Sequence, residues 1–303
     1  MRVLITGGTG LIGRALTADL LKDGHSVIVL TRDPQRVKEP FAGVDYQSWD
    51  GKTARGWGHL VEGTEAIVNL AGANLSEGLW TEDRKQAIRN SRVDAGRAVV
   101  EAIGAVQSKP AVLIQASGVG YYGVKNPDLL DESAENGDDF LSAVSRDWEA
   151  ATQPVEEMGV RRVIIRSGVV FSPRGGALAR MLLPFKLFVG GPLGSGRQWL
   201  SWIHLDDEVR AIRFLIDTVA AHGAFNLVAE AVTNAGFARV AGRIMQRPAF
   251  IPVPAFALRL VLGEMSTVVL DGQRASSKKL TDLGFQFKHY ALDEALKDLV
   301  ERK

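Results

Sequence analysis

Residues 1–32 of the chain read MRVLITGGTGLIGRALTADLLKDGHSVIVLTR. The apolar run 3–5 predicts a strand, the glycines of 7–13 predict a turn, and apolar residues at helical spacing predict a helix that ends at Gly24. A second strand is expected over 26–30. A strand, a glycine turn, a helix and another strand in this order predict two neighbouring strands of a parallel sheet joined by a helix.

The spacing of the glycines indicates what the turn binds. Gly7 permits a tight turn, Gly10 lets backbone N–H groups approach a pyrophosphate, and Gly13 lets the helix pack closely on the strand. An anion bound there lies at the positive N-terminus of the helix. We therefore expect a dinucleotide cofactor. This part of its predicted site comprises Thr6, Gly7, Gly8, Thr9, Gly10, Leu11, Ile12 and Gly13.

The residues after the second strand bear on the choice between NADP(H) and NAD(H). An acidic residue at this point binds the ribose 2′-hydroxyl of NAD, whereas an arginine suits the 2′-phosphate of NADP. The chain has Thr31 and Arg32 here, followed by Asp33. We therefore favour NADP(H) over NAD(H). The alternative, in which Arg32 is a solvated cation and Asp33 binds the ribose, stays open.

Two further strand ends belong to the same predicted site. A strand over 44–47 precedes Asp50, which either accepts the adenine amine or closes a turn before Gly51. An apolar strand over 65–72 ends in small residues that leave room for a cofactor across its end. The predicted contacts on this strand are Leu70, Ala71 and Gly72.

Composition limits the class of protein and its partners. A chain of 303 residues can bury the core of a nucleotide-binding domain and of a smaller second domain. With a formal charge of +1, neither a nucleic-acid nor a membrane partner is expected. The absence of cysteine excludes disulfides and thiolate sites, and the five histidines lack metal-ligand spacing, so no metal is expected. The first strand begins at once and leaves no room for a signal peptide, which predicts a cytoplasmic protein.

Several runs carry a resemblance to a known family. The dinucleotide turn, NLAG at 69–72 and the serine at 117 resemble an extended short-chain dehydrogenase/reductase (SDR). More specifically, the chain resembles the atypical SDRs called the "epimerase family". The runs that carry this closer resemblance include ASGVGYYG at 116–123, GGPLGSGRQ at 190–198 and SWIH at 201–204.

The resemblance implies an α/β fold: a Rossmann-type doubly wound parallel sheet that binds NADP(H), with a smaller C-terminal substrate domain. We assign 1–171 and 205–230 to the NADP-binding domain, and 172–204 and 231–303 to the substrate-binding domain. The match does not imply one established reaction. A homodimer through the helices expected at 81–106 and 138–158 is a further expectation.

The usual catalytic pair of an SDR is missing from its expected place. Such enzymes use a tyrosine as acid and base, with its pKa lowered by a lysine one helical turn later, and a serine that orients the substrate. Ser117 is present at the end of a predicted strand. On the helix expected at 138–158, the tyrosine and lysine positions fall at Leu141 and Ser145.

Two tyrosines soon after that serine are the remaining candidates for proton transfer. Tyr121 and Tyr122 either line the pocket and donate a proton or pack beneath the loop. Tyr121 and Lys125 also have the YxxxK spacing, but in a loop where helical geometry is not assured.

The predicted order of the strands places further polar residues near the cofactor site. Together they suit a small polar or anionic substrate. Arg166 either contacts the substrate or pairs with a carboxylate. The favoured function is an NADP(H)-dependent oxidoreductase with a modified site; a nucleotide-sugar epimerase and a non-catalytic NADP(H)-bound sensor or partner-binding protein are the alternatives. The substrate candidates are Asn74, Arg166, Lys186, Arg197, Gln198 and Trp202.

Overall fold

A seven-stranded, wholly parallel sheet forms the centre of the molecule, in the order β11-β7-β5-β4-β1-β2-β3. The computed structural model describes residues 1–124, 128–173 and 175–301. The chain runs outward from β1 to β3 and returns on the other side of β1 with β4, so the strand order reverses between β1 and β4. The Rossmann-type fold is confirmed. The strands are β1 (Arg2–Thr6), β2 (Ser26–Thr31), β3 (Val44–Ser48), β4 (Ala66–Asn69), β5 (Val112–Gly118), β7 (Arg161–Ser167) and β11 (Gly223–Leu227).

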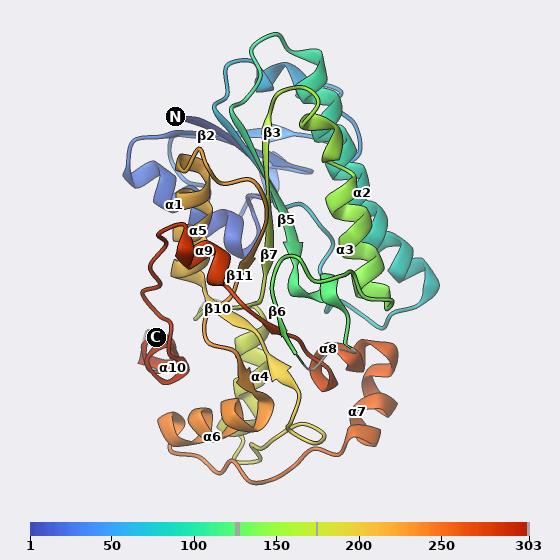
Figure 1. Cartoon of the computed structure of the whole chain (residues 1–303), viewed down its shortest axis with the longest axis vertical. Coiled ribbons are helices and arrows are strands. Elements are labelled where there is room, and N and C mark those ends of the chain that lie inside the picture. Colours follow the sequence, from blue (N-terminus) through green and yellow to red (C-terminus); the bar gives the residue numbers. More distant parts are fainter. Residues whose placement is uncertain (125–127, 174, 302–303) are drawn as a thin grey trace.

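Helices cover both faces of the sheet (Figure 1). The helices α1 (Leu11–Lys22) and α5 (Leu205–Asp217) pack on one face, and α2 (Glu82–Ala105) and α3 (Phe140–Ala150) on the other. Alternate residues of a strand point to opposite faces, so Ile5 joins the core under α1 and α5. None of the helices in the described ranges is both long and apolar enough to span a membrane.

The helix expected at 138–158 is shorter than the sequence indicated. It begins after Asp139, whose side chain caps it by accepting from the N–H of Ser142, and it ends at Ala150. A 3₁₀ turn follows and contains Pro154, which has no N–H and cannot extend the α-helical bonding. This turn is η4 (Gln153–Val155), and the other 3₁₀ turns of the described residues are η1 (Pro34–Arg36), η2 (Gly58–Val61), η3 (Val119–Tyr122) and η5 (Gly263–Ser266).

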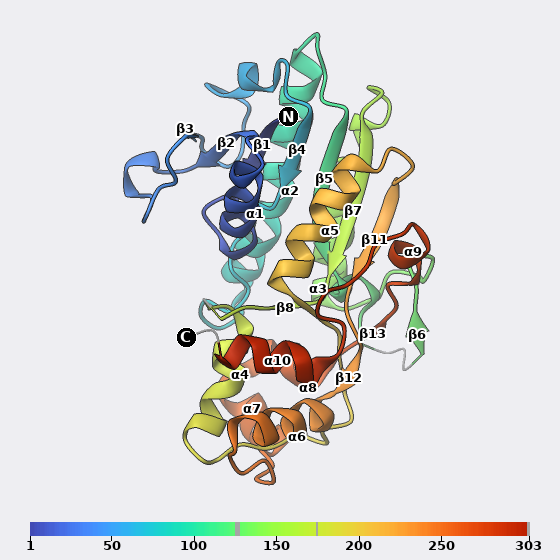
Figure 2. The same cartoon turned by 90° about the vertical axis from the view of Figure 1, so that its left-hand side faces the viewer.

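A second core lies beyond the carboxyl ends of the strands (Figure 2). It is built around Phe171, Leu182, Phe237 and Leu296, from four separate segments of the chain. Its helices are α4 (Ala177–Lys186), α6 (Asn234–Met245) and α10 (Leu292–Glu301). The short strands nearby are β8 (Val169–Phe171) with β10 (Trp202–His204), and β9 (Trp199–Leu200) with β12 (Val232–Thr233).

The C-terminal segment returns to the sheet before it enters this second core. Leu280 and Phe285 pack in the core under α1 and α5, although both lie in the stretch 231–303 that was assigned to the substrate domain. The packing therefore favours placing 274–287 with the sheet, and the two-domain division remains a prediction. The elements of the segment are α7 (Ala255–Leu262), α8 (Thr267–Leu270), β13 (Arg274–Ala275), which pairs with β6 (Leu129–Leu130), and α9 (Lys278–Asp282).

Candidate functional site

The turn between β1 and α1 has the geometry of an anion site. Gly10 is the N-cap of α1; no side chain caps the helix, and its first turn holds no acidic residue. Gly7 has a φ of +67°, and a Cβ there would lie 2.8 Å from the carbonyl carbon of Leu70. A Cβ on Gly13 would lie 2.5 Å from the carbonyl oxygen of Gly7. The close approach of helix and strand requires glycine, and the helix N-terminus is open to a phosphate.

Buried hydrogen bonds join the ends of β1, β4 and β5 beneath this turn. The hydroxyl of Thr6 donates to Oδ1 of Asn69 at 2.5 Å, and Nδ2 of Asn69 donates to Oε1 of Gln115 at 2.8 Å. Thr6 also accepts from the N–H of Ala71. Because the side chain of Thr6 is fully buried, it fixes the backbone at the ends of these strands instead of reaching a ligand. Gly72, next to Ala71, is exposed beyond the carboxyl end of β4.

At the end of β2, one of the two charged residues is engaged in the turn. Asp33 accepts from the N–H of Gln35 at 3.1 Å, caps η1, and forms an ion pair with Arg36 at 3.2 Å. Arg32 is exposed and forms no hydrogen bond or ion pair with the described residues. The local geometry therefore favours Arg32 over Asp33 as the residue left for a ligand. Thr31, before it, is half-buried.

Asp50 adopts the turn alternative. Its Oδ1 accepts from the N–H groups of Lys52 at 2.7 Å and Thr53 at 2.8 Å, and its Oδ2 accepts from the hydroxyl of Thr53. These bonds, the backbone N–H of Thr53 first among them, lower the pKa of Asp50. This geometry favours a turn-closing carboxylate over a contact with adenine.

Ser117 belongs to a buried charged group. Its hydroxyl donates to Oε1 of Glu149 on α3 at 2.6 Å, and Glu149 forms two hydrogen bonds with Arg166, each 2.9 Å long. All three residues are at most 8% exposed. The planar guanidinium matches a carboxylate with two parallel bonds, so the structure favours the pairing alternative for Arg166 over substrate contact.

The two tyrosines after Ser117 differ in what their hydroxyls do. The hydroxyl of Tyr122 donates to Oδ1 of Asn226 at 2.7 Å and accepts from Nη1 of Arg166 at 3.1 Å. Burial raises the pKa of Tyr122 to about 12, so this geometry gives it a packing role. Tyr121 is half-buried, and its ring lies 3.5 Å from Cζ of Arg166. Lys125, the second member of the YxxxK spacing, lies outside the described residues.

The remaining substrate candidates differ in their surroundings. The side chain of Trp202 is fully buried and stacks on Phe171 with ring centroids 5.3 Å apart, which favours a core position over substrate contact. The amide of Gln198 donates to the carbonyls of Leu193 and Val269, so it braces two segments. Asn74 accepts from Ser76 within its own exposed turn, while Lys186 and Arg197 are exposed.

Two histidines lie together, which the sequence did not indicate. The rings of His204 and His289 are 4.0 Å apart between centroids, and with Asp206 they form a group whose possible ligand atoms lie within 4.8 Å of one another. However, Nδ1 of His204 accepts from the N–H of Asp206 and caps α5. A neutral imidazole that accepts at Nδ1 carries its proton on Nε2, here 3.4 Å from Asp298, and has no lone pair left for a metal. The geometry therefore favours a helix cap.

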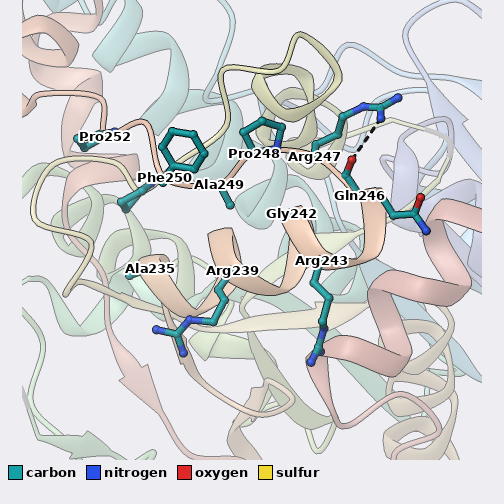
Figure 3. Close-up of a pocket in the computed structure, with 11 residues that line it drawn as sticks. Ala235, Arg239, Gly242, Arg243, Gln246, Arg247, Pro248, Ala249, Phe250 and Pro252 are labelled. Carbon is teal, nitrogen blue, oxygen red and sulfur yellow. Dashed lines mark hydrogen bonds between the residues drawn. The ribbon is translucent and has the colours of Figure 1, made fainter.

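A pocket of about 660 Å³ lies between α6 and the segment 246–252 (Figure 3). In Figure 1, α6 lies at the lower end of the molecule, away from α1, which the glycine turn precedes. The side chains of Arg239 and Arg243 extend from α6 away from the segment that carries Phe250. None of the predicted site residues lines this pocket. We therefore place the candidate site at the carboxyl ends of the strands.

Two residues of the site were not found from the sequence. Glu149 is one of them: it binds both Ser117 and Arg166, although nothing near it in the sequence marks it. Asn226 accepts from Tyr122 and donates to the carbonyl of Ser276. A polar residue between the apolar neighbours of β11 is the signal that marks it.

Comparisons with known proteins place this site in a family. The profile of the NAD dependent epimerase/dehydratase family matches residues 3–228, and that of a domain of unknown function (DUF1731) matches 253–299. The chain is similar to "Epimerase family protein SDR39U1 homolog, chloroplastic" of Arabidopsis thaliana, with 38% identity over 99% of this chain and 87% of the relative. It is 40% identical to "Epimerase family protein SAR0825" of Staphylococcus aureus, over 99% of both chains.

A solved structure agrees with these matches over the full chain. The human epimerase family protein SDR39U1, crystallised with NADPH, superposes with a TM-score of 0.88 and 35% identity, covering 100% of both chains. The chain belongs to the NAD dependent epimerase/dehydratase family, as an atypical extended SDR of the "epimerase family" group.

Proposed function

We propose that this protein is an NADP(H)-dependent oxidoreductase whose substrate is a small polar molecule bound beside Ser117. The observation that carries the proposal is the uncapped N-terminus of α1 at the point where the strand order reverses, close to the end of β5. The NADPH bound by the human relative supports NADP(H) as the cofactor. When bound, the cofactor supplies or accepts a hydride.

The chain's own residues give the substrate its partners. The proton of Ser117 points to Glu149, so the lone pairs of its Oγ are left to accept from a hydroxyl that the polar substrate carries besides its reacting carbonyl. Arg166 holds Glu149 in place and lies against the ring of Tyr121. We assign Tyr121 as the proton donor to the substrate oxygen, because the hydroxyl of Tyr122 is already bonded at both its donor and an acceptor position.

The test follows NADPH absorbance with a panel of polar aldehydes and ketones. Loss of a general acid costs typically 10²- to 10⁴-fold, so Tyr121→Phe should lower kcat by about that factor. Tyr290→Phe, which changes a half-exposed tyrosine elsewhere, is the matched control. Unchanged turnover in Tyr121→Phe would remove this residue from the mechanism, and no turnover of any compound by the wild type would contradict the oxidoreductase proposal.

The absence of the usual pair at Leu141 and Ser145 favours a second candidate, a non-catalytic NADP(H)-bound sensor or partner-binding protein. A nucleotide-sugar epimerase is the third, consistent with the family name. Mass spectrometry of nucleotide released from the purified protein separates them. Freely exchanging NADPH favours the oxidoreductase, whereas a retained nucleotide favours the other two; sugar interconversion then identifies the epimerase.

The cytoplasmic location and the homodimer remain proposals as well. The exposed positions of α2 include Glu82, Gln86, Arg89 and Arg97, so its outer face is largely polar. A dimer through α2 and α3 would therefore rest on polar contacts. Light scattering coupled to size exclusion, at low and high salt, measures whether it forms.

A further inference from the structure

Arg92 is a buried cation on α2 that forms no ion pair with a carboxylate of the described residues. It is 8% exposed, and both hydrogen bonds that the structure shows for its guanidinium come from Nη1, to the carbonyl oxygens of Ala73 at 3.1 Å and Ile88 at 2.9 Å. No acidic side chain of the described residues forms an ion pair with it. Burial, and next the charge of Arg84, lower the pKa of Arg92 to about 10, so it is still charged at neutral pH. Buried charges are normally paired, which points to a missing partner.

The guanidinium lies against Gly72, an exposed residue three positions beyond the end of β4. A Cβ built on Gly72 would be 3.0 Å from Cζ of Arg92, so the side chain packs against the backbone of that residue. The strand β4 lies between β1, which carries the glycine turn, and β5, which ends at Ser117. Arg32 lies on the opposite side of β1, at the end of β2. The position of Arg92 is therefore on the substrate side of the cofactor site.

The same guanidinium reaches the helix that lacks the usual lysine. Its Cζ lies 4.9 Å from the ring centre of Trp148, which follows Ser145 by three residues on α3. Ser145 is the position at which the YxxxK spacing would place a lysine, and its side chain there is short and buried. Arg92 of α2 thus places a cation near position 145 of α3, where the residue is an uncharged serine.

We propose that Arg92 binds the nicotinamide-side ribose of NADP(H) and supplies the cation that a lysine supplies in SDRs with the YxxxK pair. Nη1 is held by two carbonyls, which orients the planar group and leaves the N–H donors of Nε and Nη2 for ribose hydroxyl oxygens. Because the planar guanidinium is already oriented, ordering it costs less entropy when the ligand binds. This inference rests on NADP(H) being the cofactor, but it does not require turnover.

The experiment compares two ligands by calorimetric titration. NADPH contains the nicotinamide-side ribose, whereas adenosine 2′,5′-bisphosphate contains only the half of the cofactor near Arg32. In Arg92→Gln, the affinity for NADPH should fall about 10- to 100-fold, while the affinity for the bisphosphate stays within about twofold. Arg89→Gln is the control, because Arg89 lies on the same helix but is exposed and paired with Asp147. It should leave both affinities unchanged.

Two results would overturn the proposal: unchanged NADPH affinity in Arg92→Gln, or equal weakening of both ligands, which would identify a purely structural role. Should Arg92→Gln fail to fold, Arg92→Met decides. It keeps an unbranched side chain and loses both the charge and the N–H donors, so weaker NADPH binding with unchanged bisphosphate binding supports the proposal, and any other pattern contradicts it. Selective binding loss without turnover of any carbonyl compound would refute the oxidoreductase proposal alone.

Discussion

Arg32 and Asp33 are consecutive residues after β2, and of the two only Asp33 forms hydrogen bonds or an ion pair with the described residues of the following turn. Because Asp33 caps η1 and pairs with Arg36, the guanidinium of Arg32 is left for a 2′-phosphate. Charge-assisted bonds of this kind contribute about 1.5–3 kcal/mol, so Arg32→Ala should weaken NADPH binding about 10- to 100-fold and leave NADH binding unchanged.

Fluorescence titration with both nucleotides measures this preference. Arg36→Ala is the control, because it removes another exposed cation from the same turn. If the wild type and Arg32→Ala share one preference between NADPH and NADH, the assignment of the 2′-phosphate to Arg32 fails.

Single residues were predictable from the sequence where their role is local. The glycines of the turn need only their neighbours in the chain, and Gly7 and Gly13 have the close contacts that the spacing indicates. Arg166 and Trp202 depend on distant residues, since Glu149 is 17 positions from the arginine and Phe171 stacks on the tryptophan. Nothing in their own neighbourhood shows whether such side chains face a substrate or a partner.

The sequence predicted the presence of each helix and strand better than it predicted where the element ends and which elements it packs against. The second strand, expected over 26–30, is β2 (Ser26–Thr31) and extends one residue further, while α3 ends early because the 3₁₀ turn at Pro154 follows it. The return of Leu280 and Phe285 to the sheet has no signal in local periodicity, because an apolar side chain does not indicate which of two cores it joins.

The packing of α5 against β7 makes stability depend on pH. Glu208 in α5 is fully buried, accepts from the hydroxyl of Ser167 at 2.6 Å, and leaves its other oxygen without a hydrogen bond to the described residues. Burial raises the pKa of Glu208 from its ordinary 4.5 to about 7. The folded state therefore holds this proton more tightly, so its stabilising contribution is full below pH 4.5 and is lost as the pH rises to about 7.

Glu208→Gln should remove this dependence. At 1.36 kcal/mol per pKa unit, the free energy of unfolding of the wild type should fall relative to the variant by about 3 kcal/mol between pH 4.5 and 8. Urea unfolding of both proteins at several pH values gives the difference. A constant difference between wild type and Glu208→Gln over this range would show that Glu208 does not titrate in the folded protein.

At the scale of the whole molecule, the last 30 residues connect two cores. Leu280 and Phe285 pack under α1 and α5, while Leu296 of α10 packs in the second core with Phe237. Unfolding either core would release a segment that the other core needs. We therefore expect one cooperative thermal transition for the two cores, and not the independent unfolding of a cofactor domain and a substrate domain.

NADPH tests this coupling, because a ligand of the folded state stabilises every part that unfolds with its site. At 100 times its Kd, NADPH should add about 2.7 kcal/mol to the free energy of unfolding. The chain has six tryptophans, of which Trp57 lies in the core beneath α2 and Trp202 in the second core. The difference between the fluorescence melting curves of the wild type and Trp57→Phe therefore reports on the sheet, and the difference for Trp202→Phe reports on the second core. Both signals should shift together on adding NADPH. A transition of the second core that stays in place while the sheet core shifts would show two independent units and restore the division at residue 231.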